Sequence, residues 1–149
     1  MTLEERLAAM RAELDAASKR ESFWALIGAE IAAFEADRVV LRIPLRRQWI
    51  NLGGVVHGGS SAAFLDQAAG LAANATPEGR WVTAKGELSY RAPLPGDVDH
   101  LICEARALER EGRTARVVAT ASAPGADRPG LEAAYVFVRI REPSNPGTT

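Results

Sequence analysis

Residues 58–75 read GGSSAAFLDQAAGLAANA, a stretch in which Asp66 is the only charged side chain. Its apolar residues recur at helical spacing, and a helix that is apolar on nearly every face is normally buried. We therefore expect these residues to form a long helix in the core of the fold. Because a buried carboxylate without a partner is costly, we expect Asp66 to be paired or to serve a function.

The predicted helix begins with Gly58 and Gly59, directly after His57. A helix N-terminus presents unpaired N–H groups and a partial charge of about +0.5, and glycine lets another molecule approach the backbone closely. This geometry suits a carbonyl oxygen that becomes an oxyanion in acyl transfer, where one donor contributes roughly 3 kcal/mol. A tight turn into the helix without a chemical role explains the same residues, so both interpretations stay open.

Asp66 follows Gly58 by eight residues, which corresponds to about 12 Å along a helix axis. One chain therefore cannot easily place both groups at one reacting carbon, whereas two helices packed about a two-fold axis can. The residues one turn from Asp66 are all small, as close approach of a second backbone requires: Ala62, Ala63, Ala69 and Gly70. The alternative is that Asp66 merely pairs with a buried arginine or caps a neighbouring amide.

Six segments with strand-like patterns of apolar residues and flanking turns predict β-strands. They span residues 27–34, 38–45, 81–91, 98–108, 114–123 and 131–141. Thr2 and Glu5 fit a capping box that starts a helix running to about residue 19, and residues 22–26 predict a short turn that buries two aromatic side chains. The order of elements predicts an α+β fold, a mostly antiparallel sheet of about six strands wrapped around one long helix, with an extra N-terminal helix.

At 149 residues the chain is long enough for one domain. We expect an N-terminal helix within residues 1–21, the main domain at 22–141 and a disordered tail at 142–149. The 18 Lys and Arg balance 19 Asp and Glu, so no basic excess favours nucleic acid as a partner. No apolar stretch is long enough to span a membrane.

Cys103 is the only cysteine, which excludes an intramolecular disulfide and fits a reducing cytoplasm. It lies in a predicted strand, and we interpret it as a small core residue rather than a nucleophile. The two histidines, His57 and His100, have no cysteine or acidic cluster beside them, so we expect no metal site.

Residues 51–59, NLGGVVHGG, followed by Asp66 nine positions after His57, resemble the motif of the hot-dog fold acyl-CoA thioesterases of the phenylacetate-degradation (PaaI-like) type. The segment LSYRAP at 88–93 and the pair Gly112-Arg113 resemble a strand end and a hairpin of the same family. The resemblance covers residues 22–141 and implies a hot-dog fold.

The resemblance also implies hydrolysis of a thioester between coenzyme A and an acyl group. By analogy, the Gly58 N–H would hold the thioester oxygen, and Asp66 of a partner subunit would act as general base on water or as nucleophile through a mixed anhydride. Thr83 occupies a position where relatives carry Ser or Thr to help place that water. Asn51 and His57 would orient the thioester and fix the turn.

Substrate contacts are predicted for a coenzyme A substrate, with Arg91 and Arg113 chosen because they lie at predicted strand ends and turns beside the site. Gly59, Arg91, Gly112 and Arg113 would bind the substrate, the two arginines through the phosphates of coenzyme A. No cofactor is needed beyond the coenzyme A of the substrate, and the assembly would be a homodimer at minimum, or a homotetramer by family analogy.

Other interpretations remain. His57 is more typical of a hydrogen-bonded turn residue than of a base, and we adopt that interpretation; Thr83 is also an ordinary strand residue. The arginines at 91, 110, 113 and 116 are also compatible with a solvated rim. A hot-dog hydratase needs a histidine acid–base in a motif that is not found here, and a non-catalytic acyl-CoA-binding protein would gain nothing from the carboxylate of Asp66.

Overall fold

The computed structural model describes residues 1–141, so the prediction for the tail at 142–149 lies outside the described residues. All predicted strands and both predicted helices are present, with ends within three residues of the expected positions. The helices are α1 (Leu3–Ser18), α2 (Phe23–Ile27) and α3 (Gly58–Asn74), with a 3-10 turn at Arg47–Trp49. The strands are β1 (Glu30–Glu35), β2 (Arg38–Pro44), β3 (Arg80–Tyr90), β4 (His100–Glu111), β5 (Thr114–Ser122) and β6 (Leu131–Ile140).

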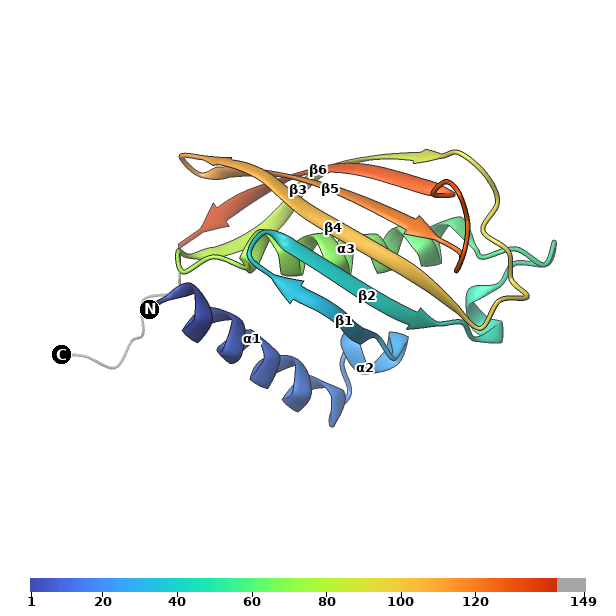
Figure 1. Cartoon of the computed structure of the whole chain (residues 1–149), viewed down its shortest axis with the longest axis horizontal. Helices are drawn as coiled ribbons and strands as arrows, with labels where there is room; N and C mark the ends of the chain where they lie inside the picture. Colours follow the sequence, from blue (N-terminus) through green and yellow to red (C-terminus); the bar gives the residue numbers. More distant parts are fainter. Residues whose placement is uncertain (142–149) are drawn as a thin grey trace.

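The strands form one antiparallel sheet in the order β1-β2-β4-β5-β6-β3, and α3 lies along its concave face (Figure 1). On β2 the apolar residues Val39, Leu41 and Ile43 are fully buried toward the helix, as period-two alternation requires when one face of a sheet is covered. Phe64 and Leu65 of α3 pack into the same core. The predicted α+β architecture is therefore confirmed.

The segment before β1 differs from the prediction. Ser22 Oγ accepts the N–H of Ala25 at 3.1 Å, and Gly28 adopts φ +63°, so these two residues cap one extra helix, α2, where a turn and the start of a strand were expected. The expected burial of two aromatic side chains was also wrong. Trp24 is buried, but Phe23 is 44% exposed because the short helix turns it toward solvent.

The side chain of Arg110 binds the C-terminal end of α3. Arg110 Nη2 donates to the carbonyls of Ala72 and Ala73 at 3.1 and 3.2 Å, and its Nη1 donates to Asp37 at 2.6 Å. Cations at this position satisfy carbonyls without a partner in the helix and complement its dipole. Arg110 is therefore a structural residue, with a side chain only 22% exposed, and does not belong to a solvated rim.

Arg110→Met should lower the free energy of unfolding by about 2 kcal/mol, because two charged hydrogen bonds to the end of α3 are lost while the aliphatic part is retained. Arg116→Met is the matched control, since Arg116 is 65% exposed and, within residues 1–141, pairs with Glu109 alone. Its effect should stay within about 0.5 kcal/mol. Urea unfolding followed by circular dichroism measures both, and equal effects would contradict the role of Arg110.

Candidate active site

The loop that leads into α3 is organised by Asn51. Its side-chain Oδ1 accepts the N–H groups of Gly53 and Val55 at 2.9 and 3.2 Å, and its backbone N–H donates to the Val55 carbonyl at 2.8 Å. The side-chain oxygen of Asn51 is thus used inside the loop, as expected of an asparagine in a turn. This geometry agrees with the turn-fixing part of the role predicted for Asn51.

His57 is the N-cap of α3. Its ring Nδ1 accepts the N–H of Gly59 at 2.9 Å, and its backbone N–H donates to the Trp49 carbonyl at 2.7 Å. A neutral ring with Nδ1 as acceptor carries its proton on Nε2. His57 is therefore a turn and capping residue in this geometry, as interpreted from the sequence.

Gly58 follows as the first residue of α3, and its N–H has no acceptor within residues 1–141. Its carbonyl accepts the Tyr90 hydroxyl at 2.8 Å and Ser61 Oγ at 3.1 Å. Tyr90 was missed in the sequence, where it stands inside the LSYRAP segment without any signal of its own. The N-terminal end of α3 thus offers the Gly58 N–H as a free donor, fixed in direction by the contacts around it.

Asp66 is exposed on α3, so the expectation that this carboxylate is buried was wrong. The helix buries its other faces, and the face of Asp66 is not covered by the sheet. Its Oδ1 accepts the hydroxyl of Thr83 on β3 at 2.8 Å. The structure therefore brings together two predicted site residues that are 17 positions apart in the chain. Asp66 pairs with this hydroxyl rather than with a buried arginine.

A cleft of about 430 Å³ lies beside this pair. Its walls come from α3, from the first half of β3 and from α1, and its lining includes both Asp66 and Thr83. The contribution of α1 was not expected, because its sequence contains no motif that indicates a site. Only long-range packing places the helix there.

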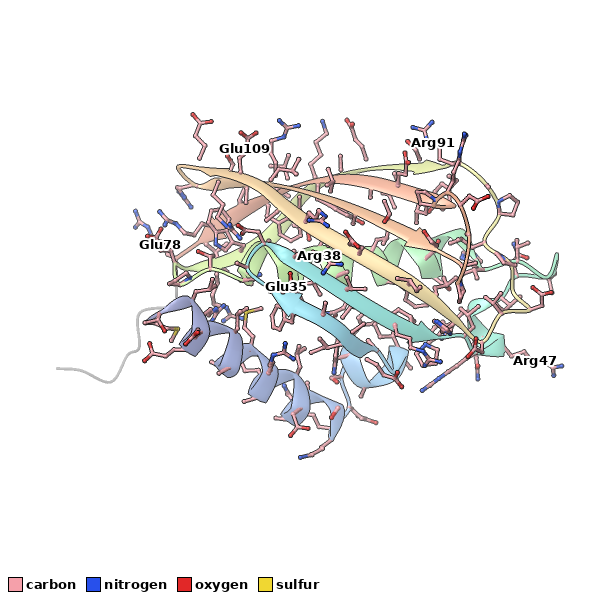
Figure 2. All side chains as sticks on the ribbon, viewed as in Figure 1. Glu35, Arg38, Arg47, Glu78, Arg91 and Glu109 are labelled. Carbon is pink, nitrogen blue, oxygen red and sulfur yellow. The ribbon has the colours of Figure 1, made fainter. Side chains whose placement is uncertain are left out.

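The arginines proposed for coenzyme A lie far apart. Arg91 pairs with Glu132 at 3.2 Å just after β3 ends, whereas Arg113, beside Gly112, donates to the Arg139 carbonyl near the start of that strand. Figure 2 shows Arg91 at the opposite end of the sheet from Glu78 and Glu109. Ten strand residues separate the two ends, which is about 30 Å. One chain therefore does not bring Arg91 and Arg113 to the same place.

The described part of the chain also bears on metal ligands, membrane spans and the state of Cys103. Within residues 1–141, no group of three His, Cys, Asp or Glu side chains could hold a metal ion, and no helix has the length and hydropathy of a membrane span. Burial raises the pKa of the Cys103 thiol to about 12. Cys103 is fully buried on β4, so its interpretation as a core residue is confirmed.

An antiparallel sheet wrapped around one long helix is the architecture of the class of hot-dog proteins. Residues 53–126 match the model of the thioesterase superfamily. The chain belongs to this superfamily.

Solved structures support the same fold. Thioesterase superfamily member 2 from zebrafish superposes with a TM-score of 0.79 at 15% identity, covering 94% of this chain and 99% of that one. A variant of the phenylacetic acid degradation protein PaaI from Thermus thermophilus gives 0.72 at 22% identity, covering 80% and 100%. A Streptococcus mutans protein bound to acetyl-CoA gives 0.67 at 21% identity, covering 75% and 88%. No curated protein sequence matches the chain.

Proposed function

We propose that this protein is an acyl-CoA thioesterase, which hydrolyses an acyl-CoA to the free acid and coenzyme A. The observation that supports this most directly is the exposed carboxylate of Asp66, oriented by the Thr83 hydroxyl at 2.8 Å beside a cleft. The free N–H of Gly58 supplies a donor of the kind that acyl transfer needs. The acetyl-CoA bound by the Streptococcus mutans relative supports an acyl-CoA as ligand.

The two groups belong to one helix and are eight residues apart, so about 12 Å along its axis separates them in a single chain. We therefore propose that each site combines Gly58 of one subunit with Asp66 of the other. The edge of β3 supports a dimer, because this strand of 11 residues pairs only with β6 among the described residues. An open edge of this length is a ready template for a second strand. A tetramer remains a prediction from family analogy.

In the proposed reaction the Gly58 N–H polarises the thioester oxygen while Asp66 removes a proton from an attacking water. Thr83 donates to Oδ1 of the carboxylate, which leaves Oδ2 for the water. The tetrahedral intermediate then collapses, the C–S bond breaks, and the thiolate of coenzyme A takes up the proton. Direct attack by Asp66 to form a mixed anhydride, followed by hydrolysis, uses the same groups.

Coenzyme A binding is proposed for Arg91 and Arg113, with Gly59 and Gly112 allowing close approach of the substrate. Because the two arginines are about 30 Å apart along β3, one coenzyme A molecule would contact only one of them from a given subunit. Arg91 lines a second hollow of about 330 Å³ together with Gly58 and Tyr90, which makes it the stronger candidate on the Gly58 side of the site.

A panel of acyl-CoA esters with short, medium, long and aromatic acyl groups, followed by thiol release, tests the function. Asp66→Asn should retain the fold and lower kcat at least about 100-fold, because the general base is lost. Asp127→Asn is the control, an acid in the loop before β6 that should leave kcat unchanged. Binding without hydrolysis by the wild type would favour a non-catalytic binding protein, and hydration of an enoyl-CoA would favour a hydratase.

The hydrogen bond from Thr83 predicts a separate kinetic effect. Thr83→Val keeps the shape of the side chain but removes the donor to Asp66, so kcat should fall about tenfold with little change in KM. Thr83→Ser keeps the hydroxyl and should restore most of kcat. If serine and valine behave alike, Thr83 is only a strand residue.

The N–H of Gly58 can be removed without changing its place in the helix. Proline is well tolerated at the first helical position, and the preceding His57, at φ −58° and ψ 131°, already has the conformation that precedes proline. Gly58→Pro should lower kcat at least about 100-fold. Gly58→Ala retains the N–H and is the control, because its Cβ meets the Tyr90 ring at 3.2 Å much as a proline would.

Mixed dimers of the same variants test whether the site is shared. In a dimer of Gly58→Pro with Asp66→Asn, one of the two sites contains both wild-type groups if the subunits share them. Co-expression should then restore about a quarter of wild-type activity, because half of the dimers are mixed and each has one intact site. No recovery in purified mixed dimers would show that the two groups do not act across subunits.

A further inference from the structure

Helix α1 forms one wall of the cleft beside Asp66. Arg6, Met10 and Glu13 line the cleft, and their spacing of four and three residues places them on one face of the helix. The opposite walls are α3 and the first half of β3. The N-terminal helix is therefore part of the site region and does more than extend the fold.

The position of α1 is fixed at several points. Arg6 Nε donates to the Asn74 carbonyl at the end of α3 at 3.2 Å. Arg11 Nη2 donates to the Phe34 carbonyl of β1 at 3.3 Å, and its guanidinium lies 5.2 Å from the Phe34 ring. Met10 between them is only 5% exposed. A side chain held in this way presents a defined surface to the cleft.

The long dimension of the cleft follows α3 and β3, two of the elements that line it. Asp66 and Thr83 lie at one end, and it continues along α3 to Asn74 and along β3 back to Arg80. That distance is about 12 Å on the helix. At the far end, the hydrogen bond from Arg6 to Asn74 joins α1 to α3.

We infer that this cleft holds the acyl group of the substrate and that Met10 limits the length of acyl chain that fits. The inference rests on the proposed function. The cleft begins at the proposed catalytic carboxylate, and its volume of about 430 Å³ is within the range of pockets that bind small organic groups. The apolar part of its lining consists of Met10, Leu71, Trp81, Val82 and Phe137.

The coenzyme A part of the substrate does not suit this cleft. Coenzyme A carries several phosphates, whereas the charged side chains of the cleft have mixed signs, with Arg6 and Arg80 beside Glu13 and Asp66. The Nε of Arg6 is already engaged by Asn74. An acyl chain can cover the apolar residues without bringing phosphates beside Glu13 and Asp66, so it is the better occupant.

The test measures the ratio of kcat/KM for decanoyl-CoA to that for butanoyl-CoA. Met10→Ala removes side-chain volume from the wall and should raise the ratio at least about tenfold, and Met10→Phe should lower it. Leu7→Ala is the matched control, because Leu7 on the same helix packs against the core but does not line the cleft. It should leave the ratio unchanged even if stability falls.

The same comparison is made without turnover, from the dissociation constants of S-decyl-CoA and S-butyl-CoA, two thioethers that cannot be hydrolysed. If the Met10 variants change the affinity ratio but the protein hydrolyses no acyl-CoA, the proposed function is overturned. The assignment of the cleft as the acyl pocket is then retained. Ratios that stay constant in both Met10 variants, or that change equally in Leu7→Ala, would overturn this inference while leaving hydrolysis untouched.

Discussion

Packing of α3 against the concave face of the sheet sets the positions of the Gly58 N–H and the Asp66 carboxylate, the two groups proposed to act on the thioester. Phe64, Leu65 and Ala68 bury one side of the helix completely, which fixes its rotation about its own axis and leaves Asp66 on the uncovered side. His57 caps its start and Arg110 its end. Because the helix is held along its length and at both ends, the spacing of amide and carboxylate is a fixed property of helical geometry.

β3 supplies the other constraint, through an irregularity in its pairing with β6. Thr83 and Tyr90 are seven residues apart, so a regular strand would point them to opposite faces. A bulge between Thr83 and Lys85 inserts one extra residue and changes this alternation. Thr83 can then reach Asp66 while Tyr90 reaches the carbonyl of Gly58. Both groups of α3 that the proposed reaction uses are therefore hydrogen-bonded to the same strand.

Whether a feature could be predicted from the sequence depends on how far apart in the chain the interacting residues lie. Strand ends and the Thr2–Glu5 capping box depend on neighbours in the chain, and they were predicted closely. The burial of Asp66 was mispredicted because an alanine-rich helix is apolar all round, and periodicity cannot distinguish a covered face from one left open. The bulge in β3 and the hydrogen bond that joins α1 to Asn74 depend on contacts between residues distant in sequence. No local sequence pattern could therefore predict them.

Under the proposed function, one dimer interface would account for two features of the single chain, the exposed edge of β3 and the exposed carboxylate of Asp66. A lone chain leaves the outer edge of β3, 11 residues long, without a neighbouring strand among the described residues, which is a liability for a monomer. It also leaves the carboxylate of Asp66 exposed on a face of α3 where the neighbouring residues are small. Pairing two copies through these features would cover the edge and place each carboxylate near the amide of the other subunit. The interaction that stabilises the assembly would then also complete the site, so selection for one would maintain the other. The wall formed by α1 belongs to a single chain, so the acyl pocket can vary without disturbing the shared catalytic groups.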